Sequence, residues 1–188
     1  MNTIEDYKAL TPAGTSTGAA GDDPAAIERA DLLDLLTKHR FFLRVTADGL
    51  TNEQASTRTT VSALTVGGLV KHVAFCERGW VDFILNGPAA MAMTEDSYAE
   101  HGDSFRLLPG ETLEGVLATY AEVAARTDAL LAEVDLNSSH PLPEAPWFPP
   151  NARWTARRAL THIVAETAQH AGHADIIRES LDGSRTMG

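Results

Sequence analysis

The segment Ala159–Asp182, ALTHIVAETAQHAGHADIIRESLD, carries four metal-binding side chains at helical spacing. An α-helix advances by about 100° per residue, so Glu166 and His170 fall about 40° and about 80° from His162 on the helical wheel. His173 falls between them, at about 20°. Imidazole and carboxylate are the usual ligands of zinc, iron and nickel, and side chains four residues apart on a helix are neighbours. The spacing therefore predicts a metal site on one helix face.

A stripe of histidine and glutamate also occurs on solvated helix faces, or as hydrogen-bonded polar groups in a core. Four such groups buried without a shared partner would destabilise the fold by several kcal/mol. Apolar residues around the stripe indicate that part of this helix is buried: Ile163, Val164, Ala168, Ile176, Ile177 and Leu181. The pattern favours a shared metal ion over a purely structural role.

Length and composition indicate one globular domain. The chain has 188 residues, of which 44% are hydrophobic, enough for a substantial core. Its formal net charge of −11 comes from 15 Lys and Arg against 26 Asp and Glu. Such a field repels phosphate, so nucleic acid is not an expected partner.

The cysteine count and the first residues bear on location. The single cysteine, Cys76, excludes an internal disulfide and fits a reducing compartment. Glu5, Asp6 and Lys8 stand where a signal peptide would have an apolar run, so neither a signal peptide nor a membrane span is predicted. The expected location is the cytoplasm, without membrane contact.

Residues 1–23 are expected to form a flexible lead-in, because residues 9–23 are rich in Gly, Thr and Ala and lack periodicity. A single domain is expected over residues 24–188. Asp23 before Pro24 predicts the start of a helix, and Asp48-Gly49 its end. A short helical turn is expected from Thr51.

A second long helix is predicted from a cap at Thr65 to Asn86, where Gly87 and Pro88 stop it. His72 lies on its apolar stripe, where a lone histidine is more often a satisfied core residue. Beside the His/Glu face of the last helix, however, His72 can supply the ligand that a single helix cannot.

The 24 residues from 87 to 110 form a long connection for a helical bundle. Their length predicts that the second and third helices are parallel, with a crossover between them. The third helix is predicted near residues 112–134, and the fourth from Thr155 to Asp182. Proline-rich residues 140–151 predict a stiff surface loop. Because no strand pattern is visible, the predicted fold class is all-α, a four-helix bundle.

Three segments resemble the DinB-like superfamily: GLVKHVAFCERGW at residues 68–80, LLPGETLEGVLATY at residues 107–120, and the last segment extended to Gly183. The resemblance is closest to a branch of mostly uncharacterised bacterial proteins and covers residues 24–183. It implies a DinB-like four-helix bundle of up-down-down-up topology, with a long crossover between helices 2 and 3. It also implies a divalent metal held by one histidine of the second helix and two ligands of the fourth.

In the mycothiol-dependent maleylpyruvate isomerases of this superfamily, the two ligands of the fourth helix are Glu and His. Glu166-x-x-x-His170 has this spacing, and His72 matches the ligand of the second helix. His162 remains an alternative ligand, and His173 is expected to support the ligands or face the substrate. Zinc is the expected ion, with nickel or iron as alternatives.

Three protein ligands leave coordination positions for water or substrate, as in catalytic sites. Thiols lose their proton on coordination, and members of the superfamily use thiols such as mycothiol or bacillithiol. The leading hypothesis is a thiol-dependent S-transferase or isomerase that acts on a small-molecule electrophile. His173 or His162 would be the catalytic residue that moves the proton. Cys76, one turn from His72, is interpreted as a packing residue.

Two other functions stay open. A non-haem iron enzyme uses the same two-histidine, one-carboxylate set, although usually on β scaffolds. A non-catalytic stress-response or dimeric interaction module would hold a structural ion, with His162 or His173 as a fourth ligand. A homodimer is therefore one expected assembly of the protein. A ferritin-like di-iron site is excluded, because no partner helix repeats the ligand spacing.

Overall fold

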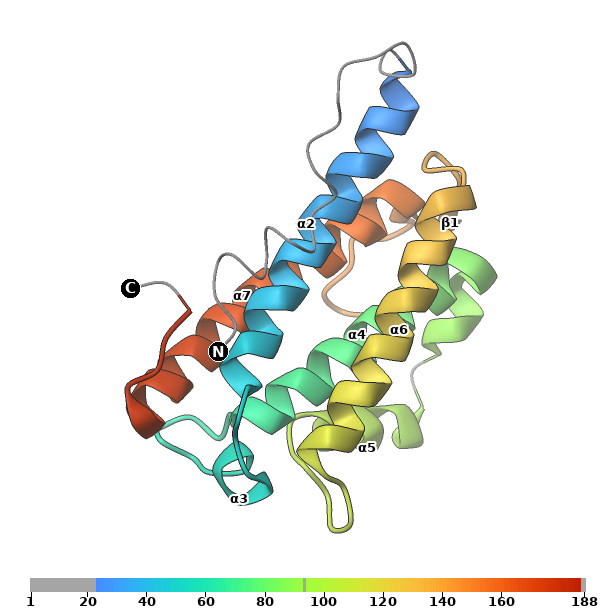
Figure 1. Cartoon of the computed structure of the whole chain (residues 1–188). Helices are drawn as coiled ribbons and strands as arrows, with labels where there is room; N and C mark the ends of the chain where they lie inside the picture. Colours follow the sequence, from blue (N-terminus) through green and yellow to red (C-terminus); the bar gives the residue numbers. More distant parts are fainter. Residues whose placement is uncertain (1–22, 93, 187–188) are drawn as a thin grey trace.

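Figure 1 shows the computed structural model, which describes residues 23–92 and 94–186. Its four long helices are α2 (Pro24–Ala47), α4 (Val66–Asn86), α6 (Leu113–Glu133) and α7 (Ala156–Asp182). Helices α2 and α7 run in one direction, and α4 and α6 run in the other (Figure 1). The predicted all-α bundle with up-down-down-up topology is confirmed. The predicted flexible lead-in lies, up to residue 22, outside the described residues.

The long helices begin at side chains that accept a hydrogen bond from a backbone N–H of the first turn. The sequence predicted three of these caps, Asp23, Thr65 and Thr155. At the other end of α7, Gly183 has a φ of 80°, and its N–H donates to the Glu179 carbonyl. These contacts satisfy backbone groups that helix ends leave unpaired. Within the described part of the chain, no helix combines the length and the apolar character needed to cross a bilayer.

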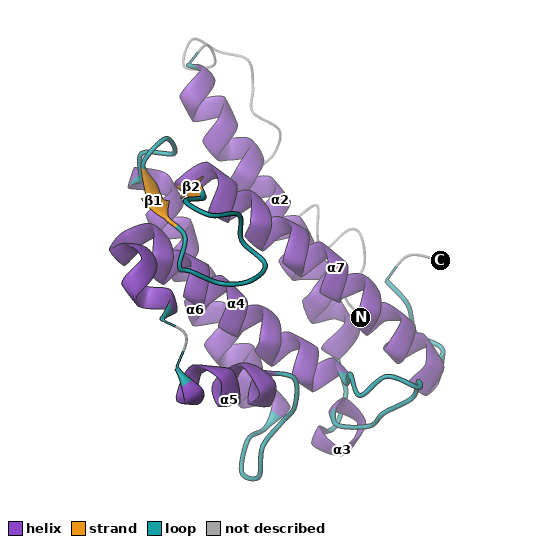
Figure 2. Cartoon of the chain, turned by 180° about the vertical axis from the view of Figure 1, so that it is seen from behind, coloured by secondary structure: helices purple, strands orange, loops and turns teal. Residues whose placement is uncertain are grey.

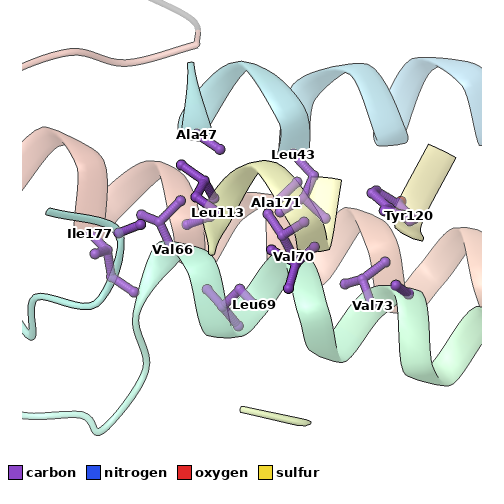
Figure 3. Packing of buried hydrophobic residues seen from close by; sticks show 14 residues of the cluster. Leu43, Ala47, Val66, Leu69, Val70, Val73, Leu113, Tyr120, Ala171 and Ile177 are labelled. Atoms are coloured by element: carbon purple, nitrogen blue, oxygen red, sulfur yellow. The ribbon is translucent and has the colours of Figure 1, made fainter. Parts of the chain in front are cut away.

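Helix α4 is central to the bundle, because its buried residues belong to both apolar clusters of the core. In the first cluster, Val70 and Val73 of α4 lie with Leu43 of α2 and Ala171 of α7 (Figure 3). The second cluster lies further along α4 and includes Leu36 of α2. Fully burying a Val or Leu side chain contributes about 1.5–3 kcal/mol. This packing holds α4 beside α7.

A buried polar network also joins the helices. Arg40 of α2 donates hydrogen bonds to both carboxylate oxygens of Glu77 on α4 and, at 2.7 Å, to Asp128 of α6. The hydroxyl of Thr127 on α6 donates to Glu77 at 2.5 Å. Arg40, Glu77 and Thr127 are all buried. The Arg40–Glu77 and Arg40–Asp128 ion pairs, with the Thr127 hydrogen bond, thus connect α2, α4 and α6.

The crossover between α4 and α6 contains two helices that the sequence did not predict. They are the 3-10 helix η1 (Gly87–Met91) and the α-helix α5 (Glu95–Ser104). Helix α5 begins at a capping box between Thr94 and Ser97. It packs against α4 on the outside of the bundle (Figure 2). The crossover is therefore folded, and it places the last turn of α5 beside α4.

Three short elements complete the described structure. Helix α3 (Asn52–Ala55) is the short turn predicted from Thr51. Strands β1 (Ser139–Pro141) and β2 (Arg153–Thr155) pair antiparallel between α6 and α7, with His140 opposite Trp154. No sign of these strands is visible in the sequence, because an alternating pattern cannot show in three residues, and the fold remains all-α. Residues 142–151 between the strands are not helical, as their prolines predicted.

Candidate metal centre

The three predicted ligands come together between α4 and α7. His72 lies on α4, Glu166 and His170 lie on α7, and one donor atom of each residue is within 4.8 Å of the other two. His72 and His170 are buried, and Glu166 is half-buried. Ligand atoms of a tetrahedral zinc ion lie roughly 3.3 Å apart. Small side-chain rotations would therefore bring all three donors to one ion.

Packing between the two helices explains why these side chains converge. Ala171 and Ala174 of α7 share a core cluster with Val70 of α4, and their small side chains let the helices approach closely. The His170 and His72 rings meet edge to face, with 4.9 Å between centroids. On α7, Nε2 of His170 is 3.4 Å from a carboxylate oxygen of Glu166, one turn earlier.

The protonation states of two members suit a cation. Burial and, to a smaller extent, the neighbouring imidazoles of His170 and His101 lower the pKa of His72 to about 4. A hydrogen bond from His170 lowers the pKa of Glu166, and the imidazole of His162 adds to this effect against the opposing effect of burial. At neutral pH, His72 is therefore a neutral imidazole and Glu166 a carboxylate. These are the forms that bind metal ions.

The two remaining histidines of the stripe contact the ligands but lie outside the converging set. Nε2 of His162 is 3.5 Å from the second carboxylate oxygen of Glu166. The His162 ring also meets the rings of Trp80 and Trp154 edge to face, with centroids 5.0 and 5.2 Å away. Nδ1 of His173 is 3.4 Å from Nδ1 of His170. Both histidines are thus in position to support ligands or to exchange protons.

Cys76 is closer to the site than its interpretation as a packing residue suggested. Its Sγ lies 3.3 Å from Nε2 of His72. Burial and, to a smaller extent, the charge of Glu166 raise the pKa of the Cys76 thiol to about 12. The thiol therefore stays protonated at neutral pH and is a poor nucleophile. Cys76 thus contacts the candidate ligand His72, and its protonated thiol is not suited to attack a substrate.

The crossover contributes side chains that the sequence analysis missed. Oγ of Ser104 is 2.8 Å from Nδ1 of His72, and the Phe105 ring stacks on the His72 ring with 3.7 Å between centroids. His101, which is exposed, approaches the same ring edge to face at 5.6 Å. One signal was available, because Gly68 stands one turn before His72, and a helical glycine often marks a close approach of backbone.

The fold and the donor set define a four-helix bundle with a candidate two-histidine, one-carboxylate metal centre. The profile of the mycothiol-S-transferase family matches residues 31–183, so the chain belongs to this family of DinB-like proteins. A conserved protein of Enterococcus faecalis, solved by crystallography, has the same fold. It aligns with a TM-score of 0.62 over 81% of this chain and 96% of that chain, at 14% sequence identity. No curated protein matches the chain significantly.

Proposed function

We propose that this protein is a metal-dependent S-transferase that joins a low-molecular-weight thiol, mycothiol or a close relative, to a small electrophile. The observation that carries the proposal is the convergence of His72, Glu166 and His170 in a chain of the mycothiol-S-transferase family. These three side chains would hold one divalent ion, with zinc favoured by the nitrogen and oxygen donors. The remaining coordination positions would face solvent and the thiol.

The chemistry follows from what the ion and the side chains can each do. When bound, the ion would favour the thiolate form of a coordinated thiol. As a ligand, the Glu166 carboxylate would offset part of the positive charge of the ion. His162 touches Glu166 and is 28% exposed, so it can accept the thiol proton and pass it to water. His173, beside His170, is the alternative proton acceptor.

The reaction forms one bond from sulfur and breaks one at the electrophile. A sulfur electron pair forms the bond to the electrophilic carbon, and the leaving group departs with its bonding pair. The thiol proton is transferred to the histidine. An isomerase would form the same bond to sulfur but would then release the thiol unchanged. Thiol consumption therefore separates the two reactions, since only transfer removes free thiol in proportion to product.

Thiol binding is tested with cobalt(II) as the ion. Adding mycothiol at millimolar concentration to the cobalt-loaded protein should produce a sulfur-to-cobalt charge-transfer band, because nitrogen and oxygen ligands give no such band. The His72→Ala variant should give no band, since it lacks a ligand. Absorbance in the near ultraviolet, followed during titration, measures the response.

Two controls make the result specific. Mycothiol disulfide has no free thiol and should leave the spectrum unchanged. The Cys76→Ser variant should keep the full response, which shows that the sulfur comes from the added thiol. If cobalt binds in one equivalent and neither mycothiol nor bacillithiol changes the spectrum, the ion is structural, and the protein is a metal-binding module without this activity.

A further inference from the structure

The His72 ring is held by the crossover as well as by the bundle. Ser104, the last residue of α5, makes two short contacts through one hydroxyl oxygen. Its Oγ lies 2.8 Å from Nδ1 of His72 and 2.7 Å from the carbonyl oxygen of His101. Both His72 and Ser104 are buried, so water does not replace these contacts. The proton positions in this chain of contacts can be worked out from its chemistry.

A carbonyl oxygen has no proton to give, so a hydroxyl 2.7 Å away from it must donate its own. Ser104 has only one hydroxyl proton, and it donates this proton to the carbonyl oxygen of His101. In the contact with His72, the Ser104 oxygen therefore accepts, and Nδ1 of His72 carries the hydrogen. A neutral imidazole has a single N–H. The lone pair of His72 is consequently on Nε2, the nitrogen that Cys76 approaches at 3.3 Å.

We infer that Ser104 is a positioning residue for the metal centre: it fixes His72 in the Nδ1–H form and so reserves Nε2 for the ion. This inference rests on the proposed metal site. Partners that fix the tautomer of a ligating histidine typically change metal affinity by about 10–100-fold. The crossover helix α5 would then be part of the metal centre, although it provides no ligand.

The backbone around Gly68 supports this role. A Cβ atom built on Gly68 would lie 1.9 Å from the carbonyl oxygen of Phe105, far inside contact distance. Only glycine therefore lets the Ser104–Phe105 backbone reach α4, one turn before His72. The Phe105 ring, stacked on His72, restricts the plane of the imidazole. Helix α4 thus has a notch at the position where the crossover must approach.

The test is the Ser104→Ala variant, studied first without metal. Long-range ¹H–¹⁵N NMR spectra near neutral pH show whether Nδ1 or Nε2 of His72 carries the proton. The wild-type protein should show the proton on Nδ1. Without the Ser104 oxygen, a buried Nδ1–H would have no acceptor, whereas Nε2–H can still donate weakly to Cys76. The proton should therefore move to Nε2 in the variant, and zinc affinity should fall by about 10–100-fold.

Two further variants separate this role from general packing. Ser180→Ala also removes a serine hydroxyl that donates to a backbone carbonyl, but Ser180 is exposed on α7. It should change neither the His72 tautomer nor zinc affinity. Ser104→Thr keeps a hydroxyl and should keep the Nδ1–H form. The inference is overturned if wild-type His72 carries its proton on Nε2, or if Ser104→Ala leaves both the tautomer and the zinc affinity unchanged.

The tautomer measurement also separates this inference from the proposed function. It needs neither metal nor thiol, so it reports on Ser104 alone. A wild-type protein with the Nδ1–H form that binds zinc but no thiol would overturn the proposed function and leave the role of Ser104 intact. If the wild-type protein responds to mycothiol but Ser104→Ala keeps the wild-type tautomer and zinc affinity, the proposed function is supported and the role of Ser104 is overturned.

Discussion

Alanine in place of His170 should lower zinc affinity by about 100-fold or more, a larger effect than loss of an outer hydrogen-bond partner. The reason is the ligand count. Only His72 and Glu166 would remain to hold the ion, and two ligands on a rigid pair of helices cannot complete a stable site. Titration calorimetry gives the affinity, and elemental analysis of the purified protein gives the metal content per chain. His72→Ala should have the same effect.

Two variants serve as controls for this result. His39→Ala removes a partly buried imidazole from α2, outside the converging set, and should leave metal content unchanged. Cys76→Ser removes the sulfur that touches His72 and should also retain the ion. Equal metal loss in the Cys76 variant would mean that sulfur is a ligand. Undiminished binding by His170→Ala would show that the ligand set is wrong.

The largest loss of stability should follow from Glu77→Ala. This substitution leaves the buried guanidinium of Arg40 without its main partner, and Asp128, which is 40% exposed, cannot replace it. Breaking a buried ion pair from one side typically costs about 3–5 kcal/mol. That is a large part of the stability of a domain this size. Urea unfolding followed by circular dichroism measures the free energy of unfolding.

An exposed pair and a double variant complete the experiment. Glu100→Ala breaks the surface ion pair with Arg78 and should cost no more than about 1 kcal/mol. Replacing both buried partners, Arg40→Met with Glu77→Leu, should restore most of the stability, because two apolar side chains need no charge partner. If Glu77→Ala costs no more than Glu100→Ala, the buried pair contributes little to the bundle.

The long helices could be predicted from the sequence because their signals are local. Asp23, Thr65 and Thr155 each stand just before an apolar stripe of helical period, and Gly183 stands just after one. The topology was predictable for a different reason. A connection too long for antiparallel neighbours left a parallel crossover as the expected arrangement. Both predictions depend on spacing along the chain, which the sequence shows directly.

Helix α5 could not be predicted in this way. Its ten residues, EDSYAEHGDS, contain few apolar side chains and an internal glycine, so no amphipathic stripe is visible. Its position depends on contact with α4 rather than on its own propensity. The two strands could not be predicted from the sequence either, because they are three residues long and pair across a proline-rich loop. Elements of this kind are fixed by tertiary contacts.

The candidate site was predictable in part. Glu166 and His170 share a helix face, so their proximity follows from helical geometry. His72 was a candidate because it is a polar residue on the apolar stripe of the second helix, and the resemblance to the DinB-like superfamily matched it to a ligand position. Ser104 and Phe105 had only the indirect signal of Gly68, because a glycine marks a close approach of backbone but does not tell which segment approaches. Their contribution depends on how α5 docks, which only the three-dimensional structure reveals.

The pairing of α2 with α7 has a consequence for how the protein is made. These are the first and the last long helices, and they pack extensively against each other (Figure 1). During synthesis the apolar side of α2 cannot be buried against α7 until α7 has left the ribosome, which happens after α2, α4 and α6 have been made. Helix α7 also carries Glu166 and His170. An ion held by these residues could therefore bind only after α7 has been synthesised, and it could not help the earlier helices to fold.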